Sequence, residues 1–140
     1  MKENHHKDVA RYRIEKAAEN LSVARQNYQL GNYRIAISQS YYCILTAMRA
    51  LLALKHHDSH RQEGVITLFH KLLIQTEQFP RDFNRIIKKL KSLREDADYG
   101  DFVEVSKKEA SEEITNAEEF LGKAEEVFVR LIMNNSSKKS

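Results

Sequence analysis

The sequence predicts an all-α protein, an antiparallel up-down helical bundle of about five helices. Composition is the first reason: the 140 residues include one Pro and four Gly, and 31% of them are charged. Periodicity is the second, because apolar residues recur at three- and four-residue steps along most of the chain. Short connections are the third, since they make consecutive helices antiparallel neighbours. A chain of this length forms one domain with a sizeable core.

The first three elements lie in the N-terminal half. A helical pattern covers residues 9–30, and Gly31 is expected to end it in a left-handed conformation. Asn32 is a candidate N-cap of the second and most apolar pattern, which extends to about Lys55 and should be the central helix. The polar loop HHDSHRQEG follows. A shorter helix then stops near Phe79-Pro80, because the residue before Pro avoids helical angles.

Two further helices complete the bundle. Residues 83–93 form the fourth pattern, and Ser106 with Glu109 has the form of a capping box that starts the fifth. We expect residues 1–8 and 134–140 to be flexible ends and residues 9–133 to form the domain. The core positions expected in the last helix are Ala110, Ile114, Ala117, Leu121, Ala124, Phe128 and Leu131.

Charge is unevenly distributed. Residues 81–94 hold six cations and one acid, a net of +5, whereas residues 104–126 hold eight glutamates and three lysines, a net of −5. Two interpretations are open: the two helices complement one another, or the basic face meets phosphate or an acidic partner. No aromatic residue alternates with these cations, which argues against stacking of single-stranded nucleic acid on this face.

Cysteine usage and hydropathy indicate the compartment. The single Cys43 excludes an internal disulfide, and its neighbours in YYCIL predict a buried, inert thiol. No apolar run approaches the roughly 20 residues that span a bilayer, and the start, MKENHHKD, has no signal-peptide pattern. We therefore expect a cytoplasmic protein without a membrane segment.

Three stretches, SQSYYCILTAMRALLALK (38–55), GVITLFHKLL (64–73) and LREDADYGDF (93–102), carry a family resemblance. In order and spacing they resemble the HEPN domains of small prokaryotic proteins, and most closely the stand-alone group with an Arg-x-x-Ala-Asp-Tyr motif. The resemblance implies a bundle of about five helices, usually a homodimer, that needs no cofactor. It also implies a minimal nucleotidyltransferase encoded nearby as partner, commonly in a toxin–antitoxin module, and RNA or a nucleotide as a further ligand.

Several HEPN branches are metal-independent ribonucleases that use an Arg followed four to six residues later by His. Here Arg94 has the place of that arginine, but Tyr99 stands where the histidine would be. A phenol with a pKa of about 10 is a poor base at neutral pH. The substitution argues against catalysis, so a non-catalytic partner role is the first hypothesis and a ribonuclease with a degenerate motif is the second, with Arg94 as its candidate residue.

The other candidate binding residues surround this motif. Arg94 and Asp98 are four residues apart, so on a continuing helix they form an ion pair with Tyr99 beside them, as a helix-end clamp or a polar cleft at a dimer seam. Tyr41 and Tyr42 point about 100° apart on their helix, so they cannot both face the same core. The first interpretation is two partly buried core tyrosines; the alternative is one in the core and the other at an interface or bonded to a polar group such as Asp98.

Arg49 and the loop histidines complete the candidates. Arg49 precedes His56 at nuclease-like spacing but lies inside the central helix, so we interpret it as structural and paired with an acid, with a dimer or ligand cleft as the alternative. Ser59-His60 before Gly64-Val65 resembles a Thr-His-x-Gly-Val stretch of the family, which makes His60 a candidate. The set His56, His57 and His60 is interpreted as a solvated loop and not as a metal site.

A third hypothesis comes from ARQNYQLGNYRIAI (24–37), which resembles one helical hairpin of the tetratricopeptide repeats. Such repeats need about three copies for stability, and one is present. A peptide-binding scaffold is therefore kept as the alternative from another class.

Overall fold

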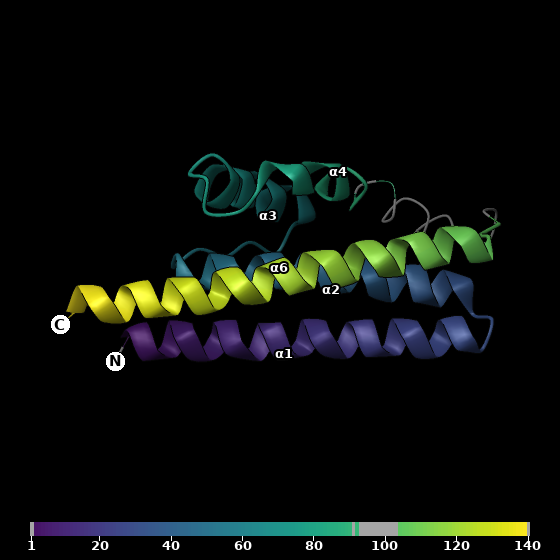
Figure 1. Ribbon diagram of the computed structural model, residues 1–140, viewed down its shortest axis with the longest axis horizontal. Helices are drawn as coiled ribbons and strands as arrows, with labels where there is room; N and C mark the ends of the chain where they lie inside the picture. Colours follow the sequence, from purple (N-terminus) through teal and green to yellow (C-terminus); the bar gives the residue numbers. More distant parts are fainter. Residues whose placement is uncertain (1, 91, 93–103, 140) are drawn as a thin grey trace.

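The computed structural model describes the chain apart from residues 1, 91, 93–103 and 140, and it confirms the all-α bundle (Figure 1). The described residues form five α-helices and no strand. These are α1 (Lys2–Gln29), α2 (Tyr33–Leu54), α3 (Gln62–Phe69), α4 (Asn84–Ile87) and α6 (Lys107–Lys139). A π-helical turn, η1 (His70–Ile74), continues α3, and a 3₁₀ turn, η2 (Arg81–Phe83), precedes α4.

The three long helices lie side by side, and the short ones form a smaller layer on one side of them (Figure 1). Helix α2 is central, since it contacts α1, α3 and α6. Helices α1 and α2 are antiparallel, whereas α6 runs in the same direction as α2 (Figure 1). Both ends of the chain consequently lie at the same end of the bundle.

The turn between α1 and α2 is a Schellman motif. Gly31 has φ 82°, the left-handed conformation expected for it. The Asn32 N–H donates to the Asn27 carbonyl (2.8 Å), and the Gly31 N–H donates to the Tyr28 carbonyl (3.1 Å). Asn32 occupies the N-cap position of α2, but its side chain makes no capping bond and donates instead to Asn27 Oδ1.

The start of α6 forms one half of the predicted capping box, the bond from the Glu109 backbone to the Ser106 side chain. The Glu109 N–H donates to Ser106 Oγ (3.0 Å), and the Ser106 hydroxyl donates to Glu109 Oε1 (3.1 Å). The outer helix boundaries differ from those expected, because α1 is helical from Lys2 and α6 continues to Lys139. Among its described residues the fourth pattern is interrupted, because a turn at Lys88 and Lys89 follows α4 before Leu90 and Ser92 are helical again.

Helix α2 supplies most of the core. Its length and composition are those of a membrane span, but 61% of its most apolar window is buried in the bundle, which is what a core helix requires. Cys43 is fully buried as predicted, and burial raises the pKa of its thiol to about 12, so the thiolate is inaccessible at neutral pH.

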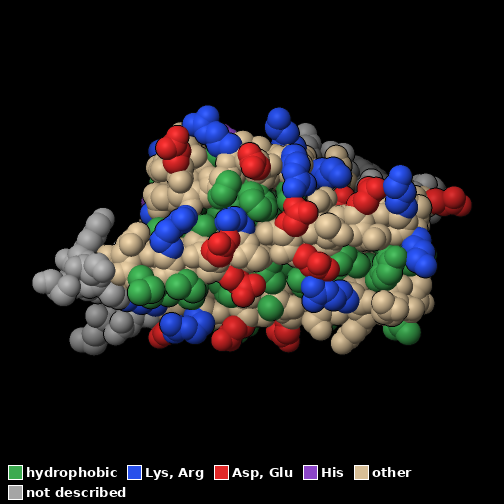
Figure 2. All heavy atoms as spheres, in the orientation of Figure 1, with side chains coloured by type: hydrophobic (Ala, Val, Ile, Leu, Met, Phe, Trp, Pro, Cys, Tyr) green, Lys and Arg blue, Asp and Glu red, His purple; other side chains and the backbone are tan. Residues whose placement is uncertain are grey.

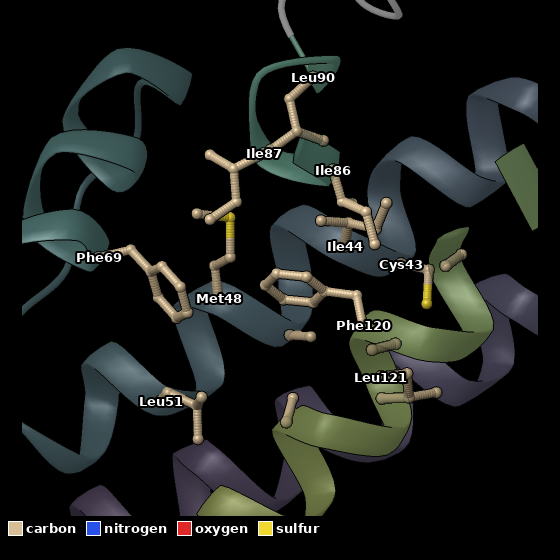
Figure 3. Close-up of a cluster of buried hydrophobic side chains, with 14 of the residues drawn as sticks. Cys43, Ile44, Met48, Leu51, Phe69, Ile86, Ile87, Leu90, Phe120 and Leu121 are labelled. Atoms are coloured by element: carbon tan, nitrogen blue, oxygen red, sulfur yellow. The ribbon is translucent and has the colours of Figure 1, made fainter. Parts of the chain in front are cut away.

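Four phenylalanines join the short-helix layer to the long helices. Phe120 of α6 lies against Phe69 and Phe79, with ring centroids 5.8 and 5.0 Å away, and Phe83 lies 5.9 Å from it. Figure 3 shows Phe120 directed into the space between α2, α3 and α4, close to Met48. Phe120 is fully buried, although the seven-residue stripe expected for the last helix does not include it.

The charge asymmetry is partly neutralised within the fold. Arg85 Nη2 lies 2.6 Å from Glu119 Oε2, and Lys89 Nζ lies 3.6 Å from Glu113 Oε1. These pairs support complementarity between the basic segment and the acidic helix. On the face shown in Figure 2, basic and acidic side chains of the described residues alternate, without a continuous basic surface.

Candidate functional site

The three residues expected to form the polar cleft, Arg94, Asp98 and Tyr99, lie outside the described residues. The expected contact between Tyr41 or Tyr42 and Asp98 lies outside them for the same reason. The candidate site must therefore be built from Tyr41, Tyr42, Arg49 and His60 and from the residues around them.

An open pocket of about 480 Å³ lies where the start of α3 meets α2. We call it the Tyr42 pocket. It contains three of the residues singled out in the sequence, Tyr41, Tyr42 and His60, although 18 positions separate Tyr42 from His60. The full lining is Tyr41, Tyr42, Leu45, His60, Arg61, Gln62 and Glu63.

The two adjacent tyrosines have different environments, as their helical positions predict. Tyr41 is 7% exposed, and its hydroxyl donates to Gln62 Oε1 at 2.8 Å. Tyr42 is 48% exposed, with its ring centroid 5.0 Å from that of Tyr41 and the ring planes at 72°. The edge-on contact holds the exposed ring of Tyr42 against a buried one.

Gln62 is the buried polar residue of this pocket. It is the first residue of α3 and is 6% exposed. Its carbonyl oxygen accepts the Tyr41 hydrogen bond, whereas its amide NH₂ donates to no described residue. The NH₂ group is not among the buried polar atoms without a partner in the described part of the chain, so solvent satisfies it.

Arg49 is part of a separate ionic cluster. Its Nε and Nη2 atoms lie 3.1 Å from Oδ1 and Oδ2 of Asp58, a bidentate pair. Arg13 of α1 also binds Asp58 Oδ2 at 2.8 Å and donates to the Arg49 carbonyl at 3.2 Å. The cluster ties α1, α2 and the following loop together, so Arg49 pairs with an acid as its structural interpretation requires.

The protonation state of Asp58 follows from these contacts. Partial burial raises its pKa, but the hydrogen bonds from Arg49 and Arg13 outweigh that effect and lower the pKa to about 2. The carboxylate therefore stays ionised at neutral pH and holds both guanidinium groups. Arg49 does not line the Tyr42 pocket.

The histidines divide between two places. His56, in a left-handed conformation (φ 62°), stacks on His6 of α1 with centroids 3.9 Å apart. His57 lines the same small pocket as these two, whereas His60 lines the Tyr42 pocket. The described residues contain no group of three or more His, Cys, Asp or Glu placed to hold a metal.

Gly64 explains the spacing of the Ser59-His60-Gly64 stretch. A Cβ atom at Gly64 would overlap the Ser59 hydroxyl, so only glycine lets the loop pack this closely on α3. Ser59 Oγ in turn accepts the Arg61 N–H at 3.3 Å, just before α3 begins. The glycine therefore sets the position of the loop that carries His60.

The sequence interpretation missed two residues of these clusters. Gln62 gives no signal, because a polar residue at a helix start is ordinarily solvated. Arg13 could have been found, since it lies four residues from both Val9 and Ala17 and hence on the face that meets the bundle.

The family model described as "HEPN domain" matches residues 10–127. A relative from Methanocaldococcus jannaschii, named "Putative toxin MJ0142", is 28% identical over 83% of this chain and 79% of its own length. A second from the same organism, named "Putative toxin MJ0605", is 36% identical over 61% of this chain and 64% of its own length. A "UPF0332 protein" from Archaeoglobus fulgidus is 31% identical over 84% of this chain and 93% of its own length.

The matched residues include α2, α3, α4, most of α1 and α6, and all seven residues that line the Tyr42 pocket. They also include the stretch 24–37, which forms the α1–α2 turn and so is part of this domain rather than of a repeat array. The chain belongs to the HEPN domain family.

Proposed function

We propose that this chain is a toxin-like HEPN protein that acts as the dimeric partner of a minimal nucleotidyltransferase in the cytoplasm. The observation that carries the proposal is the alignment of most of the chain with a relative named as a toxin. The nucleotidyltransferase partnership rests on the motif order Tyr-Tyr, Arg-Ala-Leu-Leu and Arg-x-x-Ala-Asp-Tyr, which resembles family members encoded beside such an enzyme.

The proposed mechanism is protein–protein binding that restrains the partner or the toxic activity. The polar residues Arg94, Asp98 and Tyr99 are assigned to the contact region. A permanently charged arginine is suited to a phosphate or a carboxylate, whereas Tyr99 is a poor proton acceptor at neutral pH. This role needs positioning and not proton transfer.

Homodimerisation is part of the proposal. Apolar side chains on the outer surface support it, since Tyr12 and Met133 are each 64% exposed and Val129 is 54% exposed. Light scattering at micromolar concentration should give twice the mass of the chain. A monomer across the whole accessible concentration range would contradict a cleft formed by two subunits.

Expression with and without the neighbouring gene tests the toxin role. Induction of this chain alone should slow growth, and induction with a nucleotidyltransferase encoded beside it should restore growth. The two proteins should also co-purify. Normal growth in both cultures, with no co-purification, would sink the proposal.

A metal-independent ribonuclease is the second candidate, favoured by the toxin names of the relatives and by Arg94 at the family's arginine position. Purified protein should then cleave RNA in the presence of a chelator. Arg94→Ala should abolish cleavage, whereas Arg81→Ala, which removes an exposed cation elsewhere, should not. Equal cleavage by both variants would point to a contaminating nuclease.

Restoring the family histidine provides a sharper measurement. Tyr99→His supplies an imidazole whose pKa lies near 7, which is suited to proton transfer. If the site is a degenerate nuclease, this variant should cleave RNA faster than the wild-type chain. No gain in Tyr99→His, together with inactive wild type, would leave the non-catalytic partner role as the function.

A further inference from the structure

We infer that the stacked rings of His6 and His56 form a pH-sensitive switch, which holds the start of α1 against the end of α2 at neutral pH and releases it in acid. The pair, called here the His6–His56 stack, lies in a small pocket that shares no lining residue with the Tyr42 pocket. The inference goes beyond the toxin-like role and does not depend on it.

The contact between the two rings is nearly parallel. Their centroids are 3.9 Å apart, and their planes differ by 14°. His5, on the same helix as His6, lies edge-on to it with a centroid distance of 5.8 Å. Neutral imidazole rings can stack in this way, whereas two protonated rings would hold like charges roughly 4 Å apart. The contact therefore depends on the charge of the rings.

The backbone that carries His56 is strained. His56 follows the end of α2 with φ 62°, the left-handed conformation. Its N–H donates to the Ala53 carbonyl, and the His57 N–H donates to the Leu52 carbonyl, both at 3.0 Å. This is the Schellman pattern, in which glycine is usual at the position of His56. Such strain persists only where surrounding contacts maintain it, and the ring stack is a contact of that kind.

The surroundings of the stack provide little compensation for a second positive charge. Besides the stacked pair, the pocket of about 240 Å³ is lined by His5, Val9, Arg13, Ala53, His57 and Asp58. Asp58 is the one acid in this lining, and its carboxylate already binds Arg13 and Arg49. On α2, Lys55 directly precedes the stack and donates to Gln78. Cations and imidazoles thus outnumber the single carboxylate that faces the pair.

The start of α1 is weakly anchored, so a modest repulsion can release it. Ala10 is the first residue of α1 to be fully buried, and the described side chains from His5 to Val9 are exposed or half-buried. Helix ends of this kind open at a far smaller cost in free energy than the core does. Release would uncover the apolar side of the pocket, which Val9 and Ala53 form.

The pH range follows from the chemistry of imidazole. A histidine side chain ordinarily takes up its proton near pH 6.5, at about the midpoint between neutral and mildly acidic conditions. Above this range the rings are neutral and the stack holds, and below it both rings are charged. At a separation of about 4 Å, two unit charges in a water-like medium change an equilibrium constant about fivefold.

Amide hydrogen exchange, measured by NMR on the full chain with a chelator present and expressed as protection factors, tests the switch. Between pH 7.5 and pH 5, protection of residues 6–10 should fall about fivefold or more, while that of α2 should stay within about twofold. His6→Phe keeps a ring without a charge, so its protection should not depend on pH. His56→Asn, which suits the left-handed backbone, should also remove the pH dependence.

The control is His60→Gln, which removes an exposed histidine outside the stack and should retain the wild-type pH dependence. Constant protection of residues 6–10 from pH 7.5 to pH 5 would overturn the inference. An equal fall in His6→Phe would overturn it as well, because charge on the stacked rings would then not be the cause. A fall of the same size in α2 would mean general acid unfolding and would also contradict the switch.

Discussion

At the scale of one residue, Glu113 shows how burial changes the ionisation of a charged side chain. It is 7% exposed, and its Oε2 atom has no hydrogen-bond partner. Burial raises the pKa of its carboxyl, and the opposing effects of Lys89 and Asn116 do not cancel that rise. A buried unpaired carboxylate oxygen costs stability whenever the group is ionised.

Glu113→Gln should therefore raise the free energy of unfolding at neutral pH by about 1 kcal/mol. The wild-type group favours the folded state fully only below its unfolded pKa of about 4.3, and that contribution is lost as pH rises through the higher folded value. Thermal unfolding at pH 4 and pH 8 should show the variant's advantage at pH 8 alone. Exposed Glu112→Gln is the control, and an equal gain from both variants would refute the burial argument.

Asp58 has the opposite pH dependence. Because its folded pKa is about 2, its contribution is present above the unfolded value of 3.8 and is lost as pH falls toward 2. The side chain is 40% exposed, so screening limits the contribution to about 1 kcal/mol. In urea unfolding at pH 7, the free energy of unfolding of Asp58→Asn should be about 1 kcal/mol lower than that of wild type. Between pH 4 and pH 2 the wild type should lose this contribution, whereas the variant should not, because it has no carboxyl group at this position.

A matched variant checks the assignment. Asp8→Asn removes an acid that pairs with Arg11 across one helical turn at 3.6 Å, where both side chains are mostly exposed. It should change stability far less than Asp58→Asn does. Equal losses would mean that the Arg13–Asp58–Arg49 cluster adds nothing beyond a surface ion pair.

At the scale of the elements, two glycines with opposite roles can be compared. Gly31→Ala should destabilise the protein by about 1 kcal/mol, because φ at this position is 82° and an L-residue is strained there. No atom lies within 4 Å of the added methyl group, so the loss measures backbone strain alone. Chemical denaturation gives the value, and Gly31→Asn should lose less because Asn tolerates this conformation.

Gly122→Ala is the counterpart within α6. Its added methyl also meets nothing within 4 Å, but the backbone there is right-handed helix. The same substitution should stabilise the protein by about 0.5 to 1 kcal/mol. Destabilisation at both positions would show that the methyl group, and not the backbone conformation, determines the outcome.

Elements that depend on local sequence were predictable, and those that depend on packing were less so. Gly31 and Ser106 act within a few residues, so the helix ends near them follow from the chain itself. The stop expected near Phe79-Pro80 was less accurate, because the helical segment already ends at Ile74. The π-turn at His70–Ile74 has no such local signal. Asn32 also has N-cap chemistry but bonds backward to Asn27, because the Schellman turn places that amide within reach.

At the scale of the whole molecule, Phe120 connects the two layers. It is fully buried and contacts three phenylalanines of the α3–α4 layer. Phe120→Ala should lower the free energy of unfolding by about 3 to 5 kcal/mol, the range for a large buried aromatic. Hydrogen exchange should become faster in α3 before it does in α1, because the short-helix layer loses its anchor.

Phe128 provides the comparison for that prediction. It lies on the same helix but is only partly buried. Phe128→Ala should cost clearly less and should leave exchange in α3 unchanged. A loss below 1 kcal/mol for Phe120→Ala would contradict its role as the link between the layers.

The sequence alone determined the helical class, the place of the central helix and the burial of Cys43. These follow from periodicity and from backbone chemistry that acts over one or two helical turns. The family motifs could also be recognised from the sequence, because they are defined by their order and spacing along the chain.

The tertiary structure decided which distant residues meet. Gln62 joins Tyr41 from 21 positions away, Arg13 reaches Asp58 across 45, and Phe120 faces a layer that its own helix does not specify. Periodicity tells which face of a helix is apolar but not which neighbour covers it, since that depends on the packing of all the helices together. The Tyr42 pocket exists only once α3 lies against α2.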